Sequence, residues 1–283
     1  MSDVNPRRER GLIFRFDGAP AQRAAAAVLL AACMALGACS STPKDEYAKV
    51  SNEQLYADAK SDISSGNYER AIKQLEKLEA RSAGTELSSQ AQLNLAHAYY
   101  KSNERPQALA TVERFIKMHP ASPGLPYAYY LQGLINFNDD LGVLSRLSKV
   151  DLSERDQQAS RDAYQSFRQV VERFPESMYA ADSRLRMSYI INSLAAYEVH
   201  VARYYYARGA YLAAVNRAQQ ALQEFPSAPA NEEALFLMMS SYDKLQLPAL
   251  KADAERVLRK SFPKSPYLTG EVKLPEKRWW HLW

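Results

Sequence analysis

The chain has 283 residues, 47% hydrophobic and 24% charged, and its 36 basic and 32 acidic residues give a formal net charge of +4. Five of the arginines lie within residues 1–38, and no Lys/Arg run long enough to bind a nucleic acid follows them. The composition therefore predicts no nucleic-acid partner, and the remaining 245 residues suffice for one large domain or a solenoid.

Residues 1–38 have the pattern of a lipoprotein signal peptide. An arginine-rich start is followed by an uncharged run over residues 24–38, which is too short to span a bilayer. The run ends in Leu-Gly-Ala-Cys, a lipobox whose cysteine is Cys39, and polar residues begin at Ser40. We expect cleavage before Cys39, lipid attachment to its thiol, and a lipid-anchored linker over residues 39–50.

Two alternatives to this assignment remain. Cys33 also closes a lipobox-like stretch, although cleavage there leaves a shorter apolar run. The segment also fits an ordinary secretory signal peptide. In bacterial lipoproteins an aspartate after the lipidated cysteine marks retention in the inner membrane. Ser40 stands there instead, which favours the outer membrane. With Cys39 lipidated and Cys33 removed, no disulfide can form.

Residues 51–265 contain a repeat. Each unit ends in a dipeptide that we call its mark. The mark is Ser-Ala in the first unit, His-Pro in the second and Phe-Pro in the other three, and successive marks are 37, 55, 51 and 37 residues apart. Counting back from the second residue of each mark, the first four units have alanine twelve residues earlier, and all five have an apolar residue five residues earlier. These residues are Ala71, Ala108, Ala163 and Ala214, and Leu78, Phe115, Val170, Ala221 and Leu258.

A small residue and a helix-ending proline at fixed offsets resemble the tetratricopeptide (TPR) pattern of two antiparallel helices per unit. Sustained alternation of polar and apolar residues, typical of strands, is absent from the sequence. We therefore predict an all-α, TPR-like α-solenoid of about five helix pairs. A helical bundle with coincidental Phe-Pro ends is the alternative.

The longer intervals predict two insertions. Eighteen extra residues around 139–151 lie between the helices of unit three, and their removal places Gly133 at the small-residue position of its first helix. Fourteen extra residues in unit four equal about four helical turns. We therefore expect one long helix from Met178 to about Arg208, roughly 45 Å in length, which Gly209 ends.

The sequence lacks the patterns of common catalytic and metal sites. Its histidines, His97, His119, His200 and His281, are far apart and none lies in an HExxH motif. A glycine-rich phosphate loop and a GxSxG motif are both missing. We expect no catalytic residue, metal or cofactor, and we place His97 in the core or in a groove. An enzyme would need a cluster of titratable residues that the sequence does not reveal.

Units two and three are rich in aromatic residues. Tyr100, Tyr127 and Tyr130 do not occupy repeat-defining positions, so we predict that they line a groove. With Asn94, Lys101 and Arg114 nearby, such a groove would suit an extended segment ending in an aromatic residue and a carboxylate. Ordinary packing between repeats is the alternative.

The C-terminal tail, which we assign to residues 266–283, contains all three tryptophans of the chain, Trp279, Trp280 and Trp283. Exposed tryptophan favours association, so we expect something to cover the tail. Three interpretations remain open, namely docking on the last helix pair, docking on a partner, and insertion at a membrane interface.

Several stretches, together with the lipobox and the two insertions, resemble the BamD family of lipoproteins, which belong to the outer-membrane β-barrel assembly machinery. The matching stretches are Gln74-Leu-Glu, Ala98-Tyr-Tyr-Lys, Glu113-Arg-Phe-Ile-Lys, Gly133-Leu, Ala207-Arg-Gly-Ala and Val215-Asn-Arg. The tail is not part of the family pattern.

The resemblance implies a non-catalytic periplasmic scaffold, lipid-anchored in the outer membrane, that binds BamA, other subunits of the complex and unfolded outer-membrane proteins. It makes Arg208, Tyr211 and Arg217 candidate BamA contacts, and it makes Tyr100, Tyr127 and Tyr130 candidate contacts for unfolded clients. We expect the Arg217 side chain to reach solvent beside Ala214 and to pair with an acidic residue of BamA. A TPR lipoprotein that organises other enzymes of envelope biogenesis is the alternative.

Overall fold

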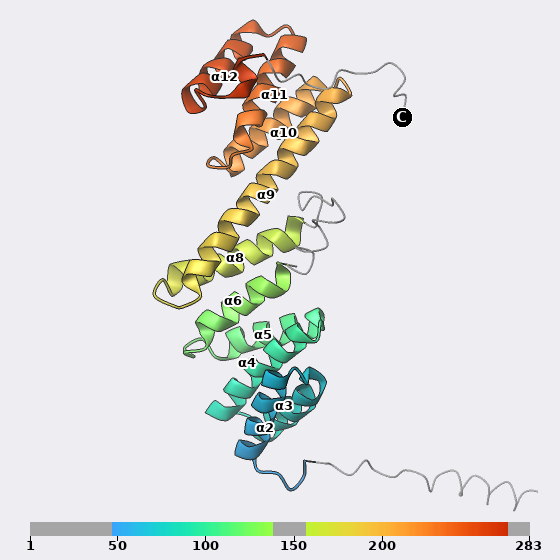
Figure 1. The fold of residues 1–283 in the computed structure, drawn as a ribbon, viewed down its shortest axis with the longest axis vertical. Coiled ribbons are helices and arrows are strands. Elements are labelled where there is room, and N and C mark those ends of the chain that lie inside the picture. The colour runs from blue at the N-terminus through green and yellow to red at the C-terminus, as the bar shows by residue number, and fades with distance from the viewer. Residues whose placement is uncertain (1–46, 138–156, 271–283) are drawn as a thin grey trace, which may run out of the picture. The chain divides into compact units, whose positions relative to one another are not determined.

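The computed structural model describes residues 47–137 and 157–270, and every regular element within these ranges is a helix. The chain divides into two compact units, Met1–Lys49 and Val50–Trp283, and the described helices lie in the second (Figure 1). They form five successive pairs: α2 (Asn52–Ser65) and α3 (Tyr68–Arg81), α4 (Glu86–Lys101) and α5 (Arg105–Met118), α6 (Leu125–Asn136) and α8 (Gln157–Arg173), α9 (Ala180–Ala207) and α10 (Tyr211–Glu224), α11 (Asn231–Lys244) and α12 (Pro248–Ser261).

Each described helix packs against the helix before it and the helix after it. Local sequence explains where the helices begin and end. The Ser51 side chain accepts a hydrogen bond from the Gln54 backbone N–H and caps α2, and Gly66 ends that helix in the left-handed conformation at φ 82°. The predicted all-α fold of about five helix pairs is confirmed.

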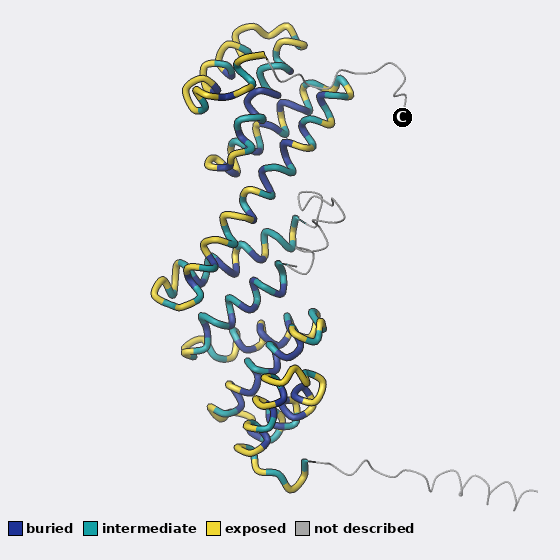
Figure 2. The backbone as a smooth tube through the Cα atoms, in the orientation of Figure 1, coloured by how far each residue is buried: buried dark blue, intermediate teal, exposed yellow. Residues whose placement is uncertain are grey.

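The small residues of the repeat lie where the two helices of a pair meet. Ala71, Ala108, Ala163 and Ala214 have no exposed surface, and their missing bulk lets the helix backbones approach each other. The apolar repeat positions, Leu78, Phe115, Val170, Ala221 and Leu258, are at most 1% exposed. Figure 2 shows the buried residues along the helix contacts, with the exposed residues concentrated in the turns and on the outer sides of the helices. The repeat offsets therefore identify core positions.

Unit three has its insertion between α6 and α8, as predicted, and residues 138–156 lie outside the described part. The contact between these two helices depends on Gly133. A Cβ atom built on Gly133 would lie only 2.5–2.8 Å from three atoms of the Phe167 ring. Since Phe167 is fully buried, Gly133 is the small residue that this helix contact requires.

The predicted long helix is confirmed as α9, whose 28 residues span about 42 Å. Gly209 follows it in the left-handed conformation at φ 78°. Two cores are arranged along α9. Ile190 and Leu194 pack with α8 and with Phe225, and Val199, Ala202 and Tyr206 pack with α10 and α11. The fourteen inserted residues thus allow one helix to belong to both cores.

Residues 266–270, assigned to the tail by sequence, are partly packed. Pro266–Leu268 form a short 3-10 helix, and the Tyr267 ring stacks on Phe236 of α11 with centroids 4.7 Å apart. Trp279, Trp280 and Trp283 lie outside the described residues. None of the described helices has an apolar stretch long enough to cross a membrane.

Candidate functional site

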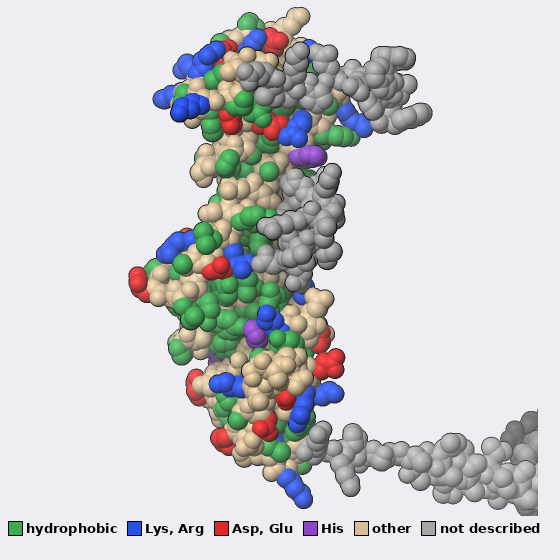
Figure 3. All heavy atoms as spheres, in the orientation of Figure 1, with side chains coloured by type: hydrophobic (Ala, Val, Ile, Leu, Met, Phe, Trp, Pro, Cys, Tyr) green, Lys and Arg blue, Asp and Glu red, His purple; other side chains and the backbone are tan. Residues whose placement is uncertain are grey.

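The tyrosines predicted to line a groove lie in an aromatic cluster, which we define as Tyr127 and Tyr130 of α6, Tyr179 before α9, and His97 of α4. Tyr130 stacks on Tyr179 with ring centroids 5.0 Å apart, and Tyr127 lies 5.4 Å from Tyr179. The Tyr127 hydroxyl and His97 Nδ1 are 2.5 Å apart. Figure 3 shows hydrophobic side chains gathered over α6 and the start of α9 on this face. The first helices of units two, three and four thus contribute to one cluster.

A charged pair borders the aromatic cluster. The Tyr130 hydroxyl donates a hydrogen bond of 2.8 Å to Asp182, and Arg186 forms an ion pair of 2.6 Å with the same carboxylate. Burial and the bond to Asp182 raise the pKa of Tyr130 to about 12, so this phenol remains a donor at neutral pH. Burial opposes ionisation of Asp182, but the hydrogen bonds from Arg186 and Tyr130 outweigh it and lower the pKa of Asp182. The carboxylate therefore stays ionised.

The cluster contains two of the three predicted tyrosines, Tyr127 and Tyr130, and the third, Tyr100, lies near it. Tyr100 is half-buried, and it lies close enough to Tyr127 to contribute to the raised pKa of that phenol. The residues that the sequence did not indicate are Tyr179 in the cluster and Asp182 and Arg186 at its border. They follow the Phe174-Pro175 mark, in a stretch where the repeat has no defining position, so no periodic signal points to them.

Two polar residues expected beside the groove have other roles. The Asn94 amide donates a hydrogen bond of 2.8 Å to the Tyr56 hydroxyl, and Arg114 forms an ion pair of 2.9 Å with Glu79. Lys101 has its ammonium 5.9 Å from the centroid of the Tyr100 ring. Of the three residues, only Lys101 thus has a described contact with a predicted groove residue.

His97 makes the stability of the cluster sensitive to pH. Its burial, together with the positive charge of Lys101, lowers the pKa of the imidazole below the 6.5 of an unfolded histidine. As the pH falls below about 6.5, the unfolded chain therefore takes up a proton that the folded chain excludes, and the free energy of unfolding decreases. Above about pH 6.5 the neutral imidazole is present in both states, so the full stability contribution of His97 is retained.

We expect His97→Gln to lose part of the stability difference between pH 7.5 and pH 5.5 measured by urea unfolding. The glutamine keeps a polar group near Tyr127 but cannot be protonated. His200→Gln, at an exposed position of α9, is the matched control for loss of a histidine. An unchanged pH dependence in the His97→Gln protein would exclude this histidine as its source.

The three residues predicted to contact BamA lie on α9 and α10 but not together. Arg208 and Tyr211 are three residues apart at the turn between the helices. The exposed Arg208 guanidinium lies 4.8 Å from the centroid of the Tyr204 ring, and Tyr211 packs edge-on against Tyr206. Arg217 lies about 9 Å further along α10, a rise of 1.5 Å for each of six residues.

Arg217 has a partner within the chain. Its Nη1 atom lies 3.1 Å from the carboxylate of Glu198 on α9, whose side chain is only 2% exposed, whereas Arg217 is 40% exposed. The expectation that this arginine reaches solvent therefore holds only in part. A buried carboxylate that lost its cation would be strongly unfavourable, so Arg217 stabilises the fold whatever else it binds.

Two further predictions concern the lipid anchor at Cys39 and metal binding. Cys39 lies outside the described residues. Among the described residues, no group of three or more His, Cys, Asp or Glu side chains is arranged to hold a metal ion.

The chain is similar to several known proteins. The crystal structure of MamA, at 13% sequence identity and a TM-score of 0.36, aligns over 79% of this chain and 97% of MamA. The outer membrane protein assembly factor BamD of Neisseria meningitidis serogroup A is 44% identical over 255 residues, covering 88% of this chain and 96% of the relative. BamD of Xylella fastidiosa strain Temecula1 is 34% identical, covering 87% and 84%. The model of the YfiO family, described as outer membrane lipoprotein, matches residues 48–268. The sequence-based resemblance is thus confirmed, and the chain belongs to the YfiO family of outer membrane lipoproteins.

Proposed function

We propose that this chain is a non-catalytic scaffold of the β-barrel assembly complex, anchored by lipid in the outer membrane and facing the periplasm. It binds BamA and other subunits and helps deliver unfolded outer-membrane proteins for insertion. The observation that carries this proposal is the 44% identity to a BamD protein over 96% of that relative. The similarity covers all five helix pairs, so it extends well beyond a generic repeat.

We propose that the BamA contact lies at the turn between α9 and α10. Arg208 is exposed there, and Tyr204 and Leu212 beside it are 50% and 64% exposed. An exposed arginine beside an aromatic and an aliphatic side chain is typical of protein interfaces. We include Tyr211 and Arg217 in this contact. Arg217 lies at its edge, because its guanidinium also neutralises the buried carboxylate of Glu198.

We propose that unfolded clients bind at the aromatic cluster. Tyr127, Tyr130 and Tyr100 are half-buried, so they keep exposed ring surface that an aromatic side chain could cover. Lys101, exposed beside the Tyr100 ring, offers a cation near the cluster, whereas Arg186 is already paired with Asp182. These features suit an extended segment with an aromatic residue and a negative charge.

The test is copurification from detergent-solubilised membranes with a tagged full-length chain. We expect BamA to copurify with the wild-type chain and to be lost or strongly reduced with Arg208→Glu/Leu212→Ala. Lys73→Glu/Leu250→Ala, which changes an exposed lysine and an exposed leucine far along the chain from this turn, is the matched control. Copurification of other envelope enzymes without BamA would instead support the alternative scaffold function.

Cys39→Ser is expected to abolish lipid labelling and release the chain from the membrane fraction. Removing the thiol removes the attachment point of the acyl chains, and stable anchoring requires more than one such chain. The circular dichroism signal of the described helices should not change, because the first of them begins at Asn52, thirteen residues after Cys39. Persistent labelling with Cys33 intact would contradict the assignment of the anchor to Cys39.

A further inference from the structure

We propose that a groove across α8 binds an extended segment of a partner protein that presents a basic and a large apolar side chain on the same side. The groove has two halves, each about 410 Å³ in volume. The exposed Gln165 of α8 lines both halves, so they adjoin at this residue. The groove shares no residue with the aromatic cluster or with the turn between α9 and α10, and it is therefore a surface in addition to the two contacts of the proposed function.

The apolar half of the groove lies where α8, α9 and α10 meet. Its walls are aromatic and aliphatic side chains, namely Tyr164, Ile191, Leu194 and Phe225. Leu194 and Phe225 are each 6% exposed and belong to the core around α9, so packing fixes their positions. An ion pair of 3.0 Å between Arg161 and Glu224 borders this half, and the Arg161 guanidinium lies 5.8 Å from the centroid of the Phe225 ring. A large apolar side chain of a partner would leave water on entering this half, which favours binding.

The polar half lies between α5, α6 and α8. Its lining includes four amide side chains, those of Gln132, Asn136, Gln165 and Gln169. Because an amide both donates and accepts hydrogen bonds, these residues suit the backbone of an extended segment. The exposed carboxylates of Glu113 and Asp162 complete the lining. Within the described part of the chain, their partners are neutral amides, Gln132 at 3.4 Å and Gln158 at 2.8 Å, and neither carboxylate has a cation beside it.

The charge of the groove indicates the kind of partner. Its lining contains three carboxylates, those of Glu113, Asp162 and Glu224, and one cation, Arg161, which Glu224 already neutralises. The two remaining carboxylates give the lining a net charge of −2, which favours a cationic partner over an anionic one. In an extended chain, residues two positions apart point to the same side and are separated by about 6.6 Å. We therefore expect the basic and the apolar residue of the partner to be two positions apart.

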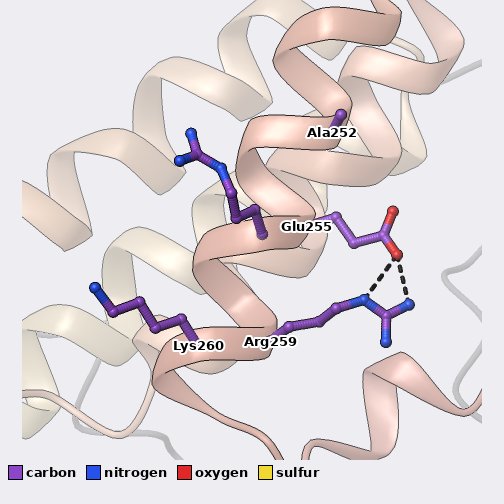
Figure 4. A pocket seen from close by; sticks show the side chains of 5 residues that line it. Ala252, Glu255, Arg259 and Lys260 are labelled. Carbon is purple, nitrogen blue, oxygen red and sulfur yellow. Dashed lines mark hydrogen bonds and ion pairs between the residues drawn. The ribbon is translucent and has the colours of Figure 1, made fainter.

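A depression on α12 shows the contrast with this groove (Figure 4). It has a volume of about 460 Å³, and one helix provides its whole lining, Ala252, Glu255, Arg256, Arg259 and Lys260. Arg259 forms an ion pair of 2.6 Å with Glu255, and Arg256 forms one of 2.6 Å with Asp253. The depression thus lacks both an aromatic wall and a carboxylate without a cation, the two features that recommend the groove across α8.

A short peptide tests the proposal directly. The protein is the mature chain from residue 39 with Cys39→Ser, which retains the whole of the unit Val50–Trp283, with its isoleucine methyl groups labelled for NMR. The probe is an acetylated glycine–serine peptide that carries one lysine and, two positions later, one phenylalanine. We expect titration with this peptide to shift the Ile191 methyl signal. Replacing its phenylalanine with alanine, or its lysine with glutamate, should weaken binding about tenfold or more.

A charge reversal tests the polar half. Glu113→Lys/Asp162→Lys should weaken binding of the lysine peptide about tenfold or more and should make the glutamate peptide the tighter ligand, because the groove then carries a positive charge. Glu69→Lys/Glu176→Lys makes the same change of charge at exposed positions outside the groove and should alter the affinity less than twofold. An inverted preference cannot result from loss of the fold, so it separates recognition from stability.

A bulky residue tests the groove as a whole. Gln165→Trp should fill the place where the two halves adjoin and weaken binding of the lysine peptide about tenfold or more. The melting temperature should stay the same, because this position is exposed. Gln219→Trp, at an exposed position of α10, is the matched control and should bind as the wild-type chain does.

The proposal is overturned if the lysine peptide leaves the Ile191 methyl signal unchanged, or if the two charge-reversal variants affect binding equally. Two other occupants would also overturn it. A dimer of the free chain that Gln165→Trp dissociates would identify a second copy of the chain. Binding that occurs only after residues 138–156 are replaced by a glycine–serine linker of equal length would identify that segment. Copurification of BamA is measured separately, so failure of this proposal leaves the scaffold function untouched.

Discussion

Arg217→Glu is expected to lower the free energy of unfolding by about 3–5 kcal/mol, the usual cost of breaking a buried ion pair by removing one partner. Glu198 is 2% exposed, and the substitution would place a second carboxylate against it. At about 2–4 °C per kcal/mol for a domain of this size, thermal unfolding followed by circular dichroism should show a decrease of roughly 10 °C.

The double variant Glu198→Met/Arg217→Met tests the explanation. Replacing both members of a buried pair by apolar residues of similar volume is often neutral or stabilising, so most of the loss should be recovered. Arg208→Glu is the control, because this exposed position should change stability by no more than about 0.5 kcal/mol. An Arg217→Glu protein that melts at the wild-type temperature would show that burial of the Glu198 carboxylate does not require this arginine.

This pair also determines how the proposed BamA contact must be tested. Loss of copurification in Arg217→Glu would not distinguish a missing contact from an altered α9–α10 pair. The Glu198→Met/Arg217→Met chain removes the cation while keeping the fold. Reduced copurification of BamA with that double variant would therefore assign the partner contact to Arg217 itself.

Gly133→Leu is expected to destabilise the chain by about 3 kcal/mol, at the upper end of the range for overpacking a core. Even Gly133→Ala should be destabilising. Alanine is favoured over glycine in a helix by about 0.8–1 kcal/mol, but its Cβ would lie 2.5 Å from a carbon of the Phe167 ring. Phe167 is fully buried and contacts Tyr130 and Phe137, so its ring has no free space into which to move. The clash therefore outweighs the helix propensity.

Gly124→Ala is the matched control, because the nearest atom to its added Cβ, at 2.9 Å, is the terminal methyl of Leu93, which can rotate away. Thermal unfolding should distinguish the two alanine variants clearly. Adding Phe167→Leu to Gly133→Ala should recover part of the loss by removing the ring. If Gly133→Ala proved as stable as the wild type, the contact between α6 and α8 would have to be looser than described.

The helix pairs, the long helix α9 and the core alanines could all be predicted from the amino-acid sequence. These features depend on local signals, because a proline after the last turn or a glycine in the left-handed conformation ends a helix, and a buried alanine recurs at the same offset in the first four units. The same offsets located Gly133 and the insertion beside it. The predicted lipobox likewise depends only on consecutive residues of the sequence.

Only the tertiary structure decided which side chains meet across units. Tyr130 and Asp182 are 52 residues apart, and Glu198 meets Arg217 only because α10 folds back along α9. The insertions change the number of residues between corresponding positions of successive units. The repeat therefore does not predict where a residue inside an insertion will lie. Tyr179 and Arg186 therefore escaped prediction, and Arg217 gained a partner within its own chain, because such contacts depend on how successive helices pack rather than on any local pattern.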